Sequence, residues 1–213
     1  MQDKAEYARK GISRGRSIIA MEYENGILLV ADNPSSLSKI SEIYDKIAFA
    51  GAGKYSEFEN LRKAGIRHAD MKGYLYSRED VTAKSLANSY SQSLGTIFSQ
   101  ELKPLEVEIL VVEVGNETKG NEMYRISFDG SIFDENGFTA IGGNSEALIT
   151  YLKTRYHLFP LKEALRLSVD TIEAGYNQTT RPEGLEVAVL DRDRAGRTFR
   201  RIGTKELTEY LRK

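Results

Sequence analysis

Two glycine-rich segments are the first places in this sequence where phosphate chemistry could be expected. Gly51-Ala52-Gly53-Lys54 contains the Gly-Lys pair of a phosphate-binding loop. That loop also needs a glycine five positions before the glycine of the pair and a hydroxyl residue after the lysine, but these positions hold Ala48 and Tyr55. The segment Gly142-Gly143-Asn144 lacks the dinucleotide-binding spacing. Both segments are therefore predicted to close a strand against a following helix, with Asn144 as the cap of its helix.

Metal and thiol chemistry have few candidate ligands in this chain. Its two histidines, His68 and His157, each lack a second histidine or a carboxylate at ligand spacing. The absence of cysteine excludes disulfides, thiolate metal sites and a cysteine nucleophile, and it fits a reducing compartment. We therefore expect both histidines to pack at the surface or half-buried, and we expect no metal and no cofactor.

Composition narrows the class of protein. The 213 residues include 30 Lys plus Arg and 31 Asp plus Glu, so there is no overall positive charge to hold a nucleic acid. The longest apolar runs, residues 27–31 and 109–112, are too short to cross a bilayer. The first sixteen residues are strongly charged, which argues against a targeting signal. The prediction is a cytoplasmic globular protein without a nucleic-acid or membrane partner.

Five arginines near the end of the chain form a basic cluster: Arg192, Arg194, Arg197, Arg200 and Arg201. A solvated face interleaved with acidic residues is the favoured interpretation, and an interface with an acidic or carboxylate-bearing protein partner is the alternative.

Hydrophobic periodicity predicts the elements that must position any site. Residues 4–13 have an apolar stripe typical of a short amphipathic helix, and Gly15 follows it as a breaker. Residues 17–23 and 27–32 form strands on either side of Asn25-Gly26, a pair whose positive φ values suit a two-residue hairpin turn. Further strands are expected at 37–42, 46–52, 107–114, 123–128, 132–141 (interrupted at 134–137), 185–190 and 198–202.

Helices are predicted between these groups of strands. They are expected around Leu61, Leu94, Leu152 and Leu165, and after Ile202. Asp80 or Thr82 is predicted to cap the second of them, and Thr204 the last. Strands separated by pairs of helices favour antiparallel sheets covered by helices, hence an α+β fold in a single domain spanning residues 1–213.

The residues then suggest a family. The matching segments run in order along nearly the whole chain: 7–17 (YARKGISRGRS), 23–35 (YENGILLVADNPS), 37–45 (LSKISEIYD), 87–90 (ANSY), 94–98 (LGTIF), 103–108 (KPLEVE), 124–126 (YRI), 129–132 (DGSI) and 185–191 (LEVAVLD). They resemble the α subunit of the actinobacterial-type 20S proteasome. The resemblance implies the four-layer αββα sandwich of the N-terminal nucleophile hydrolases over residues 15–213, preceded by the α-subunit helix at 1–14.

The resemblance also bears on catalysis. Catalytic β subunits of that family expose a threonine after cleavage behind a glycine, and its amine activates its hydroxyl. Here Gly15 fills the glycine position, so the nucleophile position falls on Arg16, a residue with no acceptor or nucleophilic atom. The acid and lysine positions fall on Asp32 and Lys39. The subunit is therefore expected to be non-catalytic.

The alternative is an active threonine or serine amidohydrolase of the same fold. Cleavage before Ser17 would create an N-terminal serine. We expect that serine to point away from Asp32 and Lys39, because a shift of one residue reverses the face of a strand.

By resemblance the chain is expected to form a seven-membered outer ring with identical copies, stacked on rings of proteasome β subunits. That ring controls the access of unfolded protein substrates and receives the C-terminal tails of a ring-shaped ATPase or another activator. The resemblance places Lys39 opposite the tail carboxylate, a charge-assisted pair. Gly15 and Lys54 line the same pocket, and several tails on one ring gain by avidity.

Two further expectations concern the beginning of the chain. Tyr7 is expected either to support the gate or to pack on its own helix. Members of the family usually carry residues before this helix that plug the pore, whereas this sequence starts at Met1-Gln2-Asp3. If the plug is absent, an assembled particle should hydrolyse unfolded peptides without an activator.

Overall fold

The computed structural model describes residues 2–116 and 118–212, so Met1 lies outside the described residues. The elements in chain order are α1 (Gln2–Ser13), β1 (Ile18–Tyr23), β2 (Gly26–Asp32), β3 (Ile40–Tyr44), β4 (Ile47–Gly53), α2 (Tyr55–Leu75), the 3-10 helix η1 (Arg78–Asp80), α3 (Ala83–Gln100), β5 (Val107–Glu113), β6 (Glu122–Ile126), β7 (Ile132–Glu135), β8 (Phe138–Ile141), α4 (Ser145–Lys153), α5 (Leu161–Tyr176), the 3-10 helix η2 (Pro182–Gly184), β9 (Leu185–Asp191), β10 (Phe199–Ile202) and α6 (Thr204–Leu211).

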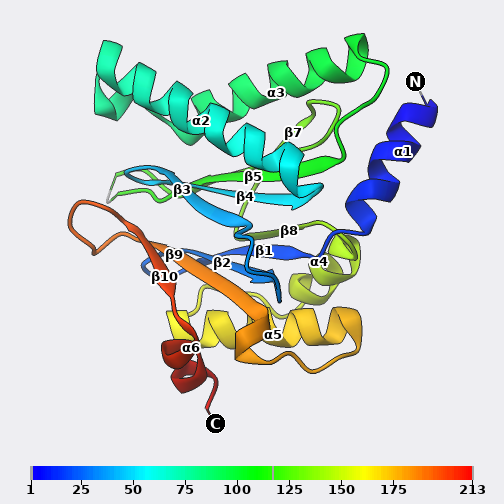
Figure 1. Ribbon diagram of the computed structural model, residues 1–213. Helices are drawn as coiled ribbons and strands as arrows, with labels where there is room; N and C mark the ends of the chain where they lie inside the picture. Colours follow the sequence, from blue (N-terminus) through cyan, green and yellow to red (C-terminus); the bar gives the residue numbers. More distant parts are fainter. Residues whose placement is uncertain (1, 117, 213) are drawn as a thin grey trace.

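These elements form four layers. One sheet has the strand order β10-β9-β2-β1-β8 and the other β3-β4-β5-β6-β7, and every pairing in both is antiparallel. Figure 1 shows α2 and α3 covering the second sheet, α4 and α5 covering the first, and α1 standing beside the sandwich. The predicted αββα sandwich is confirmed.

The central strands are apolar on both faces because each lies between two layers. In β1, Ile18 and Ala20 belong to the core between the two sheets, while Ile19 and Met21 pack toward α4 and α5. All seven residues of β2 are buried. Burying a large aliphatic side chain in this way contributes about 1.5–3 kcal/mol. The apolar runs of the sequence are therefore the strands that carry the fold.

The first hairpin is confirmed, but its predicted turn is wrong. Tyr23 pairs with Gly26, so Glu24 and Asn25 make the turn, and neither Asn25 nor Gly26 has a positive φ. Gly26 serves another purpose, since a Cβ at this position would lie 1.8 Å from the carbonyl oxygen of Leu190 on β9. The glycine lets the neighbouring strand approach.

The predicted helix caps had mixed outcomes. Thr82 caps α3, accepting a hydrogen bond from the Ser85 amide, and Asp80 lies in η1. Asn144 occupies the cap position of α4 with a φ of 63°, but its side chain makes no capping bond and donates to the Gly175 carbonyl instead. Thr204 is the first residue of α6, and Gly203 is its cap. The prediction for Asn144 is confirmed in position but not in its side-chain bond, whereas the prediction for Thr204 was wrong because the cap position falls on Gly203.

Two strand predictions also need correction. The segment predicted at 37–42 forms its strand, β3, only from Ile40, because residues 33–37 fold into a turn in which the Asn33 side chain donates to the Leu37 carbonyl. The predicted strand 132–141 is two strands in different sheets. The chain crosses from β7 to β8 at Gly137, whose φ is 76°.

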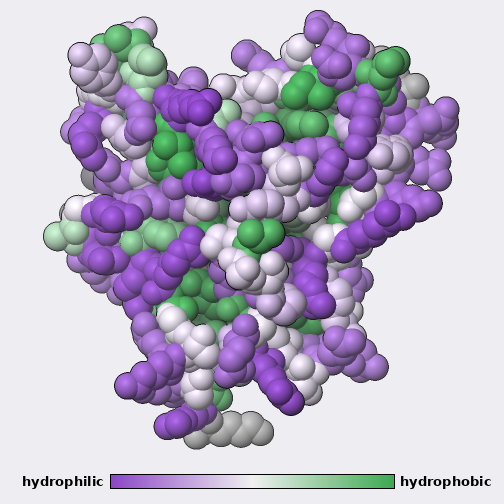
Figure 2. Space-filling view, in the orientation of Figure 1, coloured by the Kyte–Doolittle hydropathy of each residue, from purple (hydrophilic) through white to green (hydrophobic). Residues whose placement is uncertain are grey.

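Exposed large hydrophobic side chains lie close together in the sequence at the end of α2. Met71, Tyr74, Leu75 and Tyr76 are all exposed there, Tyr74 to 85%. Figure 2 shows hydrophobic residues at this corner, above a face otherwise covered largely by hydrophilic side chains. Within the described part of the chain, no helix is both long and apolar enough to span a bilayer.

Candidate functional site

The junction between α1 and β1 is closely packed against β4. A Cβ on Gly15 would lie 2.9 Å from the Gly53 amide nitrogen, so a larger residue would push these backbones apart. The Gly15 amide donates to the Ile12 carbonyl at 2.8 Å, and its own carbonyl accepts from the Gly143 amide at 2.8 Å. These contacts fix the backbone that leads into Arg16.

Arg16 extends toward the end of β2, where Asp32 is the last residue. Its Nη1 lies 2.7 Å from Oδ2 of Asp32, whose side chain is only 10% exposed. The two strands are joined at the same level by the Asp32 amide, which donates to the Ser17 carbonyl at 3.1 Å. The Arg16 guanidinium is therefore paired with Asp32, the carboxylate that, by resemblance, would assist a catalytic nucleophile.

The side chain of Lys39 contacts the backbone of Arg16. Its Nζ donates to the Arg16 carbonyl at 3.3 Å. Burial lowers the pKa of the Lys39 ammonium, the charges of Asp32 and Glu186 oppose that shift, and the charge of Arg16 adds to it. Among the residues that the structure describes, no carboxylate lies within 4.0 Å of this ammonium.

Glu186 on β9 holds the backbone from which Lys39 projects. Its carboxylate accepts hydrogen bonds from the amides of Lys39 and Ile40, at 2.8 and 3.0 Å. The Asn33 side chain at 2.7 Å and Arg201 at 3.0 Å complete its partners. Sequence reasoning missed this residue, although a lone acid within the apolar run 185–190 was an available signal.

In the structure, Gly15, Lys39 and Lys54 lie along one edge of the second sheet, where β3 begins and β4 ends. The Lys39 carbonyl accepts from the Gly51 amide at 3.0 Å, and Gly53, which Gly15 approaches, precedes Lys54. The Lys54 ammonium is paired with Glu57 at 3.3 Å, unlike that of Lys39.

Tyr7 lies two turns before Gly15 on α1. It is 46% exposed, and the Lys103 ammonium stands 5.6 Å from the centre of its ring. The helix rises about 9 Å from Tyr7 to Ser13, where α1 ends, so Tyr7 lies away from the junction at Gly15.

Ser17 is fully buried in a separate hydrogen-bond cluster. Its Oγ lies 2.7 Å from the Tyr176 hydroxyl and also donates to the Gly143 carbonyl. The Tyr176 hydroxyl donates to the same carbonyl at 3.1 Å and accepts from the Ser17 amide at 3.2 Å. Within the described residues, the serine hydroxyl makes no hydrogen bond with Asp32 or Lys39.

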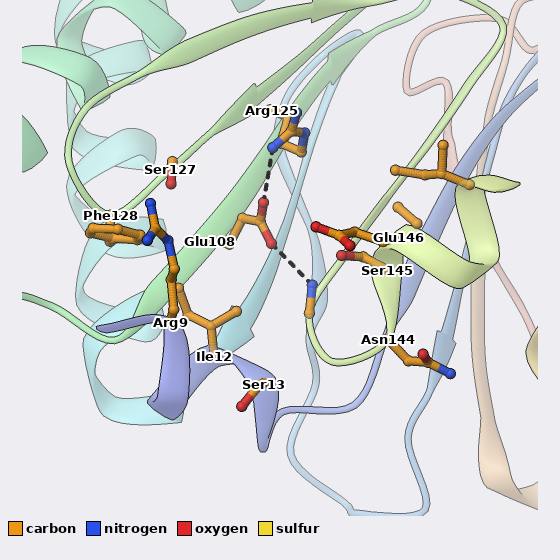
Figure 3. A pocket seen from close by; sticks show the side chains of 13 residues that line it. Arg9, Ile12, Ser13, Glu108, Arg125, Ser127, Phe128, Asn144, Ser145 and Glu146 are labelled. Carbon is orange, nitrogen blue, oxygen red and sulfur yellow. Dashed lines mark hydrogen bonds and ion pairs between the residues drawn. The ribbon is translucent and has the colours of Figure 1, made fainter. Parts of the chain in front are cut away.

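A cavity of about 500 Å³ lies beside α1, and Gly142 is part of its lining. Its lining includes Arg9, Ile12 and Ser13 from α1, Glu108 from β5, Arg125 from β6 and the first residues of α4. Figure 3 shows Glu108 between its two partners, the Arg125 guanidinium at 3.2 Å and the Gly142 amide at 3.1 Å.

Glu108 links this cavity to the α1–β1 junction. Burial raises the pKa of the Glu108 carboxyl, and the Gly142 amide and Arg125 oppose that shift. The turn that it holds is tight, since a Cβ on Gly142 would lie 2.7 Å from the Arg16 carbonyl oxygen. Glu108 therefore fixes the turn against which Arg16 packs, a role that the sequence did not reveal.

Comparisons with known proteins agree with this geometry. The family model described as "Proteasome subunit" matches residues 12–190. The chain belongs to the proteasome subunit family. Proteins named "Proteasome subunit alpha" are 53% identical in Thermomonospora curvata, 53% in Acidothermus cellulolyticus and 55% in Frankia casuarinae. The matches cover 99%, 100% and 95% of this chain, and 93%, 94% and 88% of those relatives. The resemblance to actinobacterial proteasome α subunits is confirmed.

The two histidines of this proteasome subunit are half-buried and exposed, respectively. His68 lies on α2, and His157 stacks on Phe159 with ring centres 3.5 Å apart. Within residues 2–116 and 118–212, no three His, Cys, Asp or Glu side chains gather as a metal site would require.

The basic cluster of this subunit is interleaved with acids, as the favoured interpretation predicted. Arg200 pairs with Glu206 at 2.7 Å, Arg201 pairs with Glu186, and Arg197 pairs with Glu42. Three of the five arginines thus pair with acids of the chain, and the other two, Arg192 and Arg194, donate to backbone carbonyls.

Proposed function

We propose that this proteasome subunit is a non-catalytic α subunit of a bacterial 20S core particle in the cytoplasm. Seven copies form the outer ring, which stacks on rings of β subunits. The ring controls the access of unfolded protein substrates to the proteolytic chamber. It also receives the C-terminal tails of a ring-shaped ATPase or another activator, and so contributes to ATP-dependent protein degradation.

The absence of catalysis is supported by the surroundings of Arg16 and Ser17. A guanidinium cannot attack a carbonyl, and here it is paired with the only carboxylate that the family pattern assigns to the catalytic site. The hydroxyl nearest in sequence, that of Ser17, is buried and already bonded to Gly143 and Tyr176.

The observation that carries the docking proposal is the state of Lys39. Lys39 is half-buried, and Glu186 holds its backbone; within the described residues its ammonium is hydrogen-bonded only to the Arg16 carbonyl. A tail carboxylate arriving there would form a charge-assisted pair, which contributes about 1.5–3 kcal/mol. Gly15 and the lysine stem of Lys54 border the same edge, and Tyr7 is assigned to supporting the gate further along α1.

Assembly with other subunits is supported by the exposed apolar patch at the end of α2. Met71, Tyr74, Leu75 and Tyr76 leave large apolar side chains in solvent within six residues. Neighbouring exposed apolar side chains of this kind are typical of protein–protein contacts.

The test compares tail binding by core particles that contain wild-type, Lys39→Ala or Lys63→Ala α subunits. The probe is a synthetic peptide with the tail sequence of the ring ATPase from the same organism, made with a free C-terminal carboxylate and as the C-terminal amide. Lys63 is a matched control, since it is an exposed cation paired with Glu59 on α2.

We expect Lys39→Ala to weaken binding of the free-acid peptide by about tenfold or more per tail, the loss of one charge-assisted hydrogen bond. ATPase-stimulated protein degradation should fall with it. The C-terminal amide peptide should bind wild-type particles as weakly as the free-acid peptide binds Lys39→Ala particles. Lys63→Ala particles should bind both peptides as wild type does. Equal binding by wild type and Lys39→Ala would overturn the proposal.

A further inference from the structure

Asp32 is placed where two cations could compete for it. Arg16 is the one that holds it, through the 2.7 Å contact between Nη1 and Oδ2. Lys39 is near enough for the Asp32 charge to affect its pKa, yet its ammonium donates to the Arg16 carbonyl and not to the carboxylate. Arg16 is therefore paired with a carboxylate, whereas Lys39 is available to pair with one.

The balance of charge around the site follows the same division. Arg16 and Asp32 neutralise each other, and so do Arg201 and Glu186. The positive charge that remains is that of Lys39, which matches a single carboxylate. Without Arg16, the described side chains of this group would have no net charge to attract an anion.

Removal of Arg16 would also create a competitor for the ligand. Asp32 has a side chain only 10% exposed, and a carboxylate in such a place is strongly driven to find a cationic partner. Lysine has a flexible four-carbon stem and three donor directions, so Lys39 can turn toward it. A tail carboxylate would then have to displace Asp32 before it could bind.

We propose that Arg16 is a positioning residue for tail binding: by engaging Asp32, it keeps the Lys39 ammonium available for the carboxylate of an activator tail. This inference rests on the proposed docking function. Arg16, which stands at the nucleophile position of the family pattern, would then contribute to activator binding by the α subunit.

The test is a double-mutant cycle on core particles, with the tail peptide in its free-acid and amide forms as the probe. The variants are Arg16→Ala, Asp32→Asn, the double variant Arg16→Ala/Asp32→Asn, and Arg16→Lys. Particle size and thermal unfolding are recorded for each. If Arg16→Ala does not assemble, Arg16→Gln takes its place with the same expected values.

We expect Arg16→Ala to weaken the free-acid peptide by about tenfold, since Asp32 now competes for the Lys39 hydrogen bond. Asp32→Asn alone and Arg16→Lys should stay within about threefold of wild type. The double variant should recover to within about threefold of wild type, because the competitor has gone together with its partner.

Two results would overturn the inference. An unchanged affinity for Arg16→Ala would show that Lys39 needs no protection from Asp32. A double variant as weak as Arg16→Ala would show that Arg16 contacts the tail directly. Either result leaves the docking proposal standing as long as Lys39→Ala still loses the free-acid peptide, so the two failures are distinguishable.

Discussion

Replacing Ser17 by alanine tests whether the role of this serine is structural or catalytic. The hydroxyl contacts the Tyr176 hydroxyl at 2.7 Å and the Gly143 carbonyl. The two hydroxyl protons can make only two of the three contacts among Ser17, Tyr176 and Gly143 at one time, and each hydrogen bond contributes about 1 kcal/mol net. Alanine has nearly the same volume, and Tyr176 still bonds Gly143 at 3.1 Å, so neither a large cavity nor an orphaned carbonyl is left. The net loss is one hydrogen bond, so we expect a destabilisation of about 1 kcal/mol.

The assay is thermal unfolding of the purified chain at one fixed concentration, since association adds to apparent stability. For a chain of this length, about 1 kcal/mol corresponds to a fall in Tm of roughly 2–4 °C. Tyr176→Phe removes the other hydroxyl of the pair and is the matched variant, and the two changes should be less than additive in the double variant.

Peptide hydrolysis is measured on the same samples. The isolated chain should be inactive before and after the substitution, because the serine hydroxyl is bonded to Gly143 and Tyr176 and is not poised beside a base. An activity in wild type that disappears in Ser17→Ala at unchanged Tm would refute the reasoning and revive the amidohydrolase alternative.

Three other predictions follow from the same contacts. The affinity for the tail peptide should fall as the pH rises through the pKa of Lys39, because the ammonium loses its charge there; burial lowers this pKa from its ordinary value of 10.5. An affinity that stays constant up to pH 10.5 would contradict this. Glu108→Ala removes the partner of the Gly142 amide, while Arg125 keeps Glu135 at 2.9 Å, so urea unfolding should show a loss of about 1–3 kcal/mol, and an unchanged free energy of unfolding would contradict it. Gly53→Ala should cost well over about 2 kcal/mol, since φ is 103° and the new Cβ would lie 2.0 Å from the Glu106 carbonyl oxygen; its control, Gly196→Ala, has open space and should cost only about 1–2 kcal/mol, so equal losses in urea unfolding would count against the argument.

Local sequence was sufficient to predict the elements whose burial is continuous along the chain. The strands around Ile27 and Val111 are apolar on both faces because they are central in their sheets, and the period-two or unbroken pattern reports this directly. The helix pairs were visible for the same reason. Helices and strands whose side chains are buried in a regular pattern can therefore be predicted from residues that are neighbours in the sequence.

Features defined by contacts between distant segments were missed. Gly26 is needed because of the Leu190 carbonyl, and the crossing at Gly137 depends on two sheets that the sequence does not order in space. Glu186 bonds backbone amides more than 140 positions away. Nothing within a window of a few residues specifies such partners.

The candidate site shows the same division. The positions of Arg16, Asp32 and Lys39 followed from the family pattern, whereas the pairing of Arg16 with Asp32 and the carbonyl contact of Lys39 needed three-dimensional geometry. Glu108 was hidden because its partners lie on β6 and in the turn after β8.

The most direct measurement is peptidase activity with particle sizing, made on this chain alone and after co-expression with the proteasome β subunit from the same organism. We expect the chain alone to hydrolyse no peptide, and we expect co-expression to yield a large particle of stacked rings whose activity depends on the β subunit. A chain that remains monomeric with the β subunit, or that hydrolyses peptides by itself, would contradict this expectation.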